Sequence, residues 1–259
     1  MIKLQNIYAG YYNKDVIKDI NINFKAGQIT TLIGPNGCGK STIIKVMSRI
    51  IKASRGSVLV NDSCLNDLKF YDLAKQISVL PQLRTAPSID VETLVSFGRF
   101  TYTGFLRTLS NTDKTFIEKA MEDTGIVKLR HKKLEEISGG ERQKVFIAMC
   151  LAQNTNIMLL DEPTTFLDIN YQLEILELLK KLNKMGKTII MVLHDLAQAI
   201  AYSHCIVVIE SGRVVDAGTP KEIVGRGTID RVFKVESKCF HHDEKSYYYF
   251  EHIRDTCHN

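Results

Sequence analysis

Residues 34–42 of this chain have the spacing of a phosphate-binding loop. They match G-x-x-x-x-G-K-S/T and lie between an apolar run and a helical pattern. In such a loop successive backbone N–H groups face the phosphates, the lysine neutralises β- and γ-phosphate oxygens, and the next hydroxyl binds Mg²⁺. The expected nucleotide contacts are Asn36, Gly37, Cys38, Gly39, Lys40, Ser41 and Thr42, with Ser41 also as a metal ligand.

A second glycine-rich segment, Ser138-Gly139-Gly140-Glu141, predicts a helix start that can face a phosphate. Ser-x-x-Glu is a capping box, in which the Ser138 hydroxyl and the Glu141 carboxylate each accept a backbone N–H. We expect the two glycines to leave the positive end of this helix open to an anion. If the first loop already holds the phosphates, this second segment has to contact a nucleotide bound by a partner copy.

Two adjacent carboxylates follow an apolar strand pattern at 157–160. We expect Asp161, at the strand end, to hold the shell of the Mg²⁺ ion. Glu162 points elsewhere and can orient and partly deprotonate an attacking water. The pair therefore predicts nucleotide hydrolysis and not binding alone.

Three further side chains are expected near the nucleotide. His194 closes the next apolar strand, so it can reach the γ-phosphate from the same sheet edge. Gln82, after Pro81 at another strand end, is a neutral ligand for the metal and the water. Tyr11 precedes the loop and can stack on a base, with Tyr12 as a weaker alternative.

Cys38 lies inside the phosphate loop, near a helix N-terminus and Lys40. Both features lower a thiol pKa. The sequence therefore predicts a thiol whose alkylation blocks nucleotide binding and which the bound Mg-nucleotide protects. The alternative is a small filler residue with no special reactivity.

The elements around these motifs alternate between strands and helices. Strands are expected at 2–7, 17–24, 29–33, 58–60, 77–80, 157–160 and 188–193, and helices at 42–51 and 168–182. Longer amphipathic segments at about 85–136 predict a mostly helical insertion. Strand–helix–strand repeats predict a parallel sheet with right-handed crossovers.

Composition sets the broad class of protein. The 259 residues are 44% hydrophobic and 24% charged, which is typical of a globular protein of one or two domains. No apolar run reaches the roughly 20 residues of a membrane span, and the start lacks the apolar stretch of a signal peptide. The six cysteines have no metal-binding spacing, and a net charge of +5 gives little support for nucleic-acid binding.

Taken together, these motifs resemble the ATP-binding subunit of an ABC transporter. Residues 34–42 are similar to its Walker A motif, 159–162 to Walker B and 138–143 to the signature; Gln82, Asp168, His194 and Tyr11 match the Q-loop, D-loop, switch histidine and A-loop. The resemblance implies an α/β P-loop NTPase (RecA-like) core with a parallel sheet, an antiparallel β subdomain and a helical, signature-bearing subdomain at about 85–150. The cassette would cover residues 1–235, with a short C-terminal appendix at 236–259.

The resemblance also implies a mechanism and partners. Two cassettes close head to tail and trap two ATP, each with Mg²⁺, between one Walker A and the other signature. Hydrolysis drives integral-membrane permease subunits, and indirectly a substrate-binding protein, from the cytoplasmic face of the membrane. Glu141 replaces the commoner glutamine of the signature, which weakens a ribose contact without abolishing closure.

Finer similarity points to importers of ferric siderophore, haem or cobalamin, through stretches such as 95–99 and 192–199. Three alternatives stay open. A zinc or manganese importer would use the same cassette. A non-transport ABC ATPase is disfavoured because the chain has one cassette and no room for a long coiled coil between Lys40 and Ser138. A purely regulatory nucleotide-binding module is disfavoured by the presence of Glu162 and His194.

Overall fold

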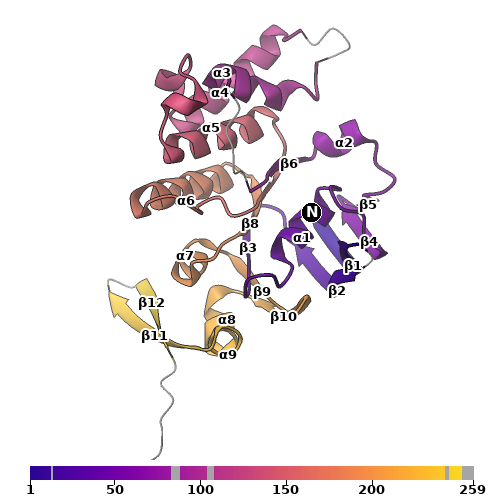
Figure 1. The fold of residues 1–259 in the computed structure, drawn as a ribbon, viewed down its shortest axis with the longest axis vertical. Helices are drawn as coiled ribbons and strands as arrows, with labels where there is room; N and C mark the ends of the chain where they lie inside the picture. Colours follow the sequence, from indigo (N-terminus) through magenta and orange to yellow (C-terminus); the bar gives the residue numbers. More distant parts are fainter. Residues whose placement is uncertain (13, 83–87, 104–107, 243–244, 253–259) are drawn as a thin grey trace, which may run out of the picture. The chain divides into compact units, whose positions relative to one another are not determined.

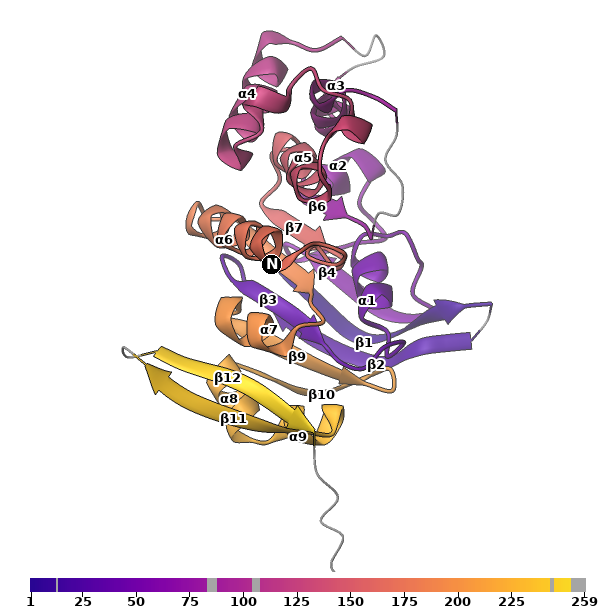
Figure 2. The ribbon, with the colours of Figure 1, turned by 60° about the vertical axis from the view of Figure 1, so that its left-hand side comes forward.

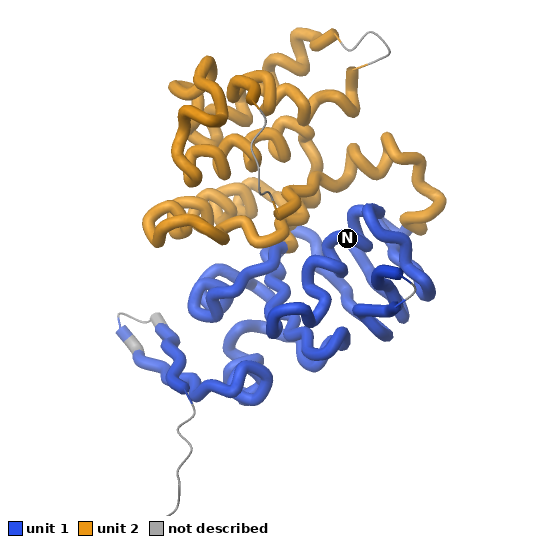
Figure 3. The backbone as a smooth tube through the Cα atoms, viewed as in Figure 1, with its two compact units in different colours: residues 1–62, 191–259 blue, residues 63–190 orange. Residues whose placement is uncertain are grey.

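The computed structural model describes residues 1–12, 14–82, 88–103, 108–242 and 245–252 (Figure 1). The chain divides into two compact units (Figure 3). Unit 1 contains Met1–Asp62 and Met191–Asn259, and unit 2 contains Ser63–Ile190. Among the helices in the described ranges, none combines the length and the apolar composition that crossing a bilayer requires.

Unit 1 begins with an antiparallel layer. β1 (Ile2–Tyr11) lies between β2 (Lys14–Phe24) and β4 (Arg55–Val60). Buried and exposed residues alternate along the second half of β2, as in a sheet with one face on a core. The strands predicted at 2–7 and 17–24 are confirmed, and both are longer than predicted. Register irregularities let β1 continue to its hairpin with β2.

Unit 1 also contains the parallel strands that lead to the glycine-rich loop. β3 (Ile29–Ile33) is fully buried and pairs in parallel with β9 (Cys205–Glu210), and β10 (Arg213–Gly218) pairs antiparallel to β9. α1 (Lys40–Met47) follows β3 after the loop, and α7 (Leu196–Tyr202) precedes β9. The predicted strand–loop–helix order is therefore confirmed, with α1 shorter than the expected 42–51.

The C-terminal part of unit 1 folds into α8 (Pro220–Gly225), α9 (Thr228–Phe233) and a hairpin of β11 (Val235–His242) and β12 (Lys245–His252). The hairpin packs against α7 and α9 (Figure 2). The sequence patterns predicted none of these four elements, and only a short appendix was expected at 236–259. The last residues, 253–259, lie outside the described part of the chain.

Unit 2 carries most of the helices. Its elements are β5 (Ser63–Cys64), α2 (Phe70–Ala74), β6 (Ile77–Leu80), α3 (Val91–Ser96), the 3₁₀ turns η1 (Phe97–Arg99), η2 (Val127–Leu129) and η3 (Leu134–Glu136), α4 (Asn111–Thr124), α5 (Gly139–Ala152), β7 (Ile157–Leu160) and α6 (Ile169–Lys184). β6 and β7 pair in parallel, and α5 packs against α3, α4 and α6. The helical composition predicted for 85–136 is confirmed where that stretch is described. β8 (Thr188–Val192) crosses the sequence boundary between the units.

Candidate functional site

The phosphate loop of unit 1 curves around the side chain of its lysine. Gly39, the residue before α1, has φ +107°, a conformation that favours glycine. The Lys40 ammonium donates hydrogen bonds to the backbone carbonyls of Gly34 (2.7 Å) and Pro35 (3.0 Å). A long cationic side chain is thus already held inside the loop that the sequence singled out.

Burial of Cys38 contradicts the lowered thiol pKa that was expected from the sequence. The side chain is only 6% exposed, and burial raises the pKa of the Cys38 thiol above its ordinary value. The Lys40 ammonium, 3.9 Å from the sulfur, acts in the opposite direction but is outweighed. The sequence-based prediction of a lowered pKa is therefore wrong, because desolvation disfavours the thiolate more than one nearby cation favours it.

We expect Cys38 to react slowly with iodoacetamide at pH 7.5, at least about ten-fold more slowly than the exposed Cys239. Because its pKa is raised, the rate should increase as the pH climbs past the ordinary thiol value of about 8.5. Mass spectrometry of the native protein at several pH values measures both rates. Equal rates at pH 7.5 would contradict the burial argument.

Tyr11, at the end of β1, is linked to α1. The Lys45 ammonium donates to the Tyr11 hydroxyl at 3.2 Å and lies 5.6 Å from the centre of its ring. Tyr11 is partly exposed, whereas the Tyr12 side chain is fully exposed. His194 also belongs to unit 1; it follows β8 and is exposed, next to Asp195, which caps α7 by accepting the Gln198 N–H.

In unit 2, the structure brings Gln82 and Glu162 together. β6 and β7 end side by side, with Leu80 opposite Leu160, so the residues that follow them share one edge. Gln82 Nε2 donates to Glu162 Oε2 at 2.7 Å, and Thr165 Oγ1 donates to the same oxygen at 3.1 Å. Glu162 has φ +55°, a left-handed conformation that is uncommon for a residue with a side chain. The chain thus leaves the extended strand conformation at the residue that carries the carboxylate.

Asp161 immediately precedes this bend and is buried. Its N–H donates to the Leu80 carbonyl at 2.9 Å, which continues the pairing of β6 with β7 by one step. The two adjacent carboxylates therefore differ in setting, since Asp161 still belongs to the sheet edge and Glu162 is half-exposed beyond it.

The capping box predicted at the start of α5 is confirmed. Ser138 Oγ accepts the Glu141 N–H at 3.2 Å, and Glu141 Oε2 accepts the Ser138 N–H at 2.8 Å. The hydrogen bonds from the Ser138 backbone and hydroxyl hold the pKa of the Glu141 carboxyl below its ordinary value. Glu141 therefore remains an anion engaged with its own helix start.

The expectation that both signature glycines leave the helix start open is wrong for Gly140. A Cβ at Gly140 would lie 2.0–2.6 Å from ring atoms of Tyr171, so this glycine makes room for a side chain of the same unit. A Cβ at Gly139 would meet only Leu167, at an ordinary 3.7 Å. Gly139 is thus the more open of the two glycines.

Tyr171 is a site residue that sequence reasoning missed. Its hydroxyl lies 3.2 Å from Ser138 Oγ, and its N–H is capped by the Asp168 carboxylate at 3.0 Å. The sequence placed Tyr171 only within the helix expected at 168–182. The available signal was a tyrosine one turn after a capping aspartate, but no local pattern links it to Gly140.

The expected site residues divide between the two units. Unit 1 holds the phosphate loop, Tyr11 and His194, whereas unit 2 holds Gln82, Asp161, Glu162, Asp168 and the segment 138–141. Within unit 2 the structure joins Gln82 to Glu162, and it joins Asp168 to the signature segment through Tyr171.

Comparison with known proteins shows the family of this chain. The model of the family described as ABC transporter matches residues 17–165. This chain belongs to that family. It is an ATP-binding subunit with the P-loop NTPase fold, and the subunits of this class are ATPases that drive transport.

Among its relatives is the iron(3+)-hydroxamate import ATP-binding protein FhuC of Bacillus subtilis, 43% identical over 92% of this chain and 89% of the relative. The petrobactin import ATP-binding protein FpuC of Bacillus anthracis is 38% identical over 96% of this chain and 92% of its own length. A solved dimeric bacterial ABC transporter cassette superposes with a TM-score of 0.74 at 29% identity, covering 85% of this chain and 99% of that one.

Proposed function

We propose that this ATPase powers an importer of ferric siderophores. The observation that carries the proposal is the 43% identity, over nearly the whole chain, to an iron(3+)-hydroxamate import ATP-binding protein. A petrobactin import protein at 38% identity supports the same cargo class. In this proposal residues 1–235 form the cassette, with the helical subdomain at about 85–150, and 236–259 are an appendix to it.

The first unit would hold the nucleotide. Backbone N–H groups of residues 36–42 would face the phosphates, and the Lys40 ammonium would exchange its carbonyl partners for β- and γ-phosphate oxygens. The Tyr11 ring would stack on the adenine. Ser41, Asp161 and Gln82 supply the hydroxyl, carboxylate and amide oxygens that suit Mg²⁺. The ion would neutralise charge on the β- and γ-phosphates.

Glu162 is the proposed general base. Hydrogen bonds from Gln82 and Thr165 to its Oε2 hold the carboxylate in place, and in this proposal the carboxylate orients a water and accepts its proton. Gln82 thereby positions the carboxylate as well as the metal. His194 would donate a hydrogen bond to the γ-phosphate and stabilise charge that develops there.

The signature segment is proposed to act on the ATP of a second copy. α5 is a helix of 14 residues, so its N-terminus carries the positive end of a helix dipole, next to the Ser138 hydroxyl and the open Gly139. A solved relative at 29% identity is a dimer, which supports this arrangement. Phe166, which is 88% exposed just before Asp168, would contact the partner across the D-loop.

Membrane subunits are proposed to dock on the helical part of unit 2. Phe97 and Phe100 form an exposed aromatic pair there, with ring centres 4.6 Å apart. The proposed docking region is 82–107, of which residues 83–87 and 104–107 lie outside the described ranges. The chain would thus be a peripheral protein at the cytoplasmic face of the membrane, served indirectly by a substrate-binding protein and with no role in nucleic-acid binding.

Uptake in cells whose only copy carries Glu162→Gln tests the proposed cargo. We expect uptake of a radiolabelled ferric hydroxamate to fall by at least about ten-fold because hydrolysis is lost, with zinc and manganese uptake unchanged. Glu122→Gln, the same change at an exposed residue of α4, serves as the matched control. A fall in zinc or manganese uptake alone would assign the chain to a metal-ion importer.

A further inference from the structure

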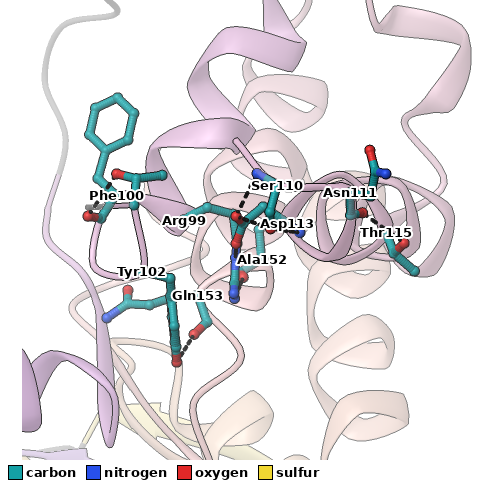
Figure 4. A network of polar contacts seen from close by, with 10 residues as sticks. Arg99, Phe100, Tyr102, Ser110, Asn111, Asp113, Thr115, Ala152 and Gln153 are labelled. Atoms are coloured by element: carbon teal, nitrogen blue, oxygen red, sulfur yellow. Dashed lines mark hydrogen bonds and ion pairs between the residues drawn. The ribbon is translucent and has the colours of Figure 1, made fainter. Parts of the chain in front are cut away.

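Arg99 is a buried cation that joins three parts of unit 2. Its side chain is almost fully buried, and Nε donates to Asp113 Oδ1 at 2.9 Å while Nη1 donates to the Ala152 carbonyl at 2.8 Å (Figure 4). The ring centres of Tyr102 and Phe116 lie 3.8 and 4.4 Å from the guanidinium carbon Cζ. Although burial opposes it, hydrogen bonds from Ser110 and the Arg99 guanidinium hold the pKa of Asp113 below its ordinary value.

This geometry requires arginine. A guanidinium presents several donors in a flat fork, so it can bond a carboxylate and a carbonyl at once while lying against aromatic rings. A lysine ammonium keeps the charge but has neither the fork nor the flat faces. Breaking a buried pair of this kind also leaves an uncompensated charge, which is strongly destabilising. Arg99 and Asp113 therefore keep fixed positions relative to each other.

The segment around Arg99 is pressed against the C-terminal end of α5. A Cβ at Gly98 would lie 2.2 Å from the Met149 carbonyl oxygen, and the Tyr102 hydroxyl donates to the Gln153 carbonyl at 3.0 Å (Figure 4). Together with the Arg99–Ala152 bond, these contacts fix η1 to the last turn of that helix.

Two routes lead from this end of α5 to the proposed active site. The first is α5 itself, whose 14 residues span about 21 Å and follow the N-cap residue Ser138 of the signature. The second starts at the Gln153 side chain, which donates to the carbonyl of Ala74 at the end of α2 (2.5 Å) and to that of Ile77 at the start of β6 (3.1 Å). β6 is four residues long and leads to Gln82, which bonds Glu162.

The opposite side of the segment is exposed and aromatic. Phe97 and Phe100 flank Arg99, are 39% and 43% exposed, and contact each other with their rings tilted. In this short segment Phe97 and Phe100 thus lie on the exposed side, whereas Gly98 and Arg99 contact α5.

We propose that Arg99 is a positioning residue that couples the Phe97–Phe100 surface to the signature and to the Gln82–Glu162 pair. The occupant of that surface is an apolar segment of the membrane subunit, so the inference rests on the transport function proposed above. Displacement of the aromatic pair by the membrane subunit moves α5 and β6 together, because the buried clamp does not stretch. Arg99 itself contacts neither nucleotide nor cargo.

The test compares hydrolysis by the purified chain with hydrolysis by the complex that copurifies with its membrane subunits. Arg99→Lys should leave the turnover of the free chain unchanged and lower the stimulation by membrane subunits at least about ten-fold. Arg130→Lys is the matched control, since Arg130 pairs with Glu92 and Glu118 in the same unit. Thermal unfolding of each variant monitors folding.

A second variant on the surface keeps the test decisive if Arg99→Lys folds poorly. Phe97→Ser/Phe100→Ser should lose the same stimulation, and adding Arg99→Lys should cause no further loss, because both changes interrupt one pathway. Full stimulation in Arg99→Lys, equal losses in the free chain and the complex, or additive losses would each overturn the coupling role. A wild-type complex that shows stimulated hydrolysis but imports no ferric siderophore would reject only the proposed cargo.

Discussion

Glu162→Gln is expected to bind ATP normally and to hydrolyse it about 10²–10⁴-fold more slowly than the wild type. The amide keeps the shape of the side chain, but it cannot accept a proton from water. In the proposed cycle two copies close on bound ATP and reopen after hydrolysis, so dimers of this variant should accumulate when ATP is added. Steady-state hydrolysis, nucleotide titration and light scattering measure the three effects.

Glu122→Gln controls for loss of a carboxylate from the same unit and should behave as the wild type. Loss of a general base slows a reaction by about 10²–10⁴-fold. A turnover of Glu162→Gln within about two-fold of the wild type would therefore reject the base assignment. Loss of ATP binding in that variant would instead mean that the carboxylate serves the nucleotide site structurally.

Gly140→Ala is expected to lower ATP turnover by about 10²-fold and the free energy of unfolding by about 1–3 kcal/mol. The new methyl group would lie 2.0 Å from the Tyr171 ring, so either the ring or the first turn of α5 must shift. Such a shift also breaks the contact between Tyr171 and Ser138. Hydrolysis assays and denaturant unfolding measure both effects.

A double-mutant cycle identifies the cause. In a Tyr171→Ala background, Gly140→Ala should no longer destabilise the protein, because the atoms that clash are gone. Gly139→Ala adds the same methyl group without a clash and should leave the unfolding midpoint unchanged. Additive effects of the two substitutions at 140 and 171 would contradict the steric explanation.

Strand positions were predictable where apolar residues form a continuous run. β3, β6 and β7 have the bounds predicted from the sequence, since a strand buried on both faces contains few polar residues and is bounded by turn residues. The end of α1 was predicted too late. Arg49 adopts a positive φ, which a right-handed helix does not contain, so the helix stops although the apolar pattern continues.

The C-terminal helix α8 was missed although its signal is local. Thr219 and Glu222 form a capping box around Pro220, which is well suited to the first turn of a helix. The hairpin that follows was not predicted, because its strands mix charged and aromatic residues and the hairpin depends on packing against α7 and α9. Two strands alone have little stability in water.

The sequence by itself determined the features that depend on a few neighbouring residues. These include the strand–loop–helix order around Lys40, the capping box at Ser138 and the carboxylates at the end of β7. Their physical basis is backbone conformation and hydrogen bonds within one turn, which residue type and spacing specify directly.

Only the tertiary structure decided the contacts between distant residues and the effects of burial. Gln82 and Glu162 are 80 positions apart, and Gly140 is small because of a ring on another helix. Arg99 finds partners on α4 and at the end of α5. The pKa of Cys38 depends on how completely its surroundings exclude water, so a motif that is correct in sequence gave the wrong direction. Packing brings these groups together, and no local spacing encodes it.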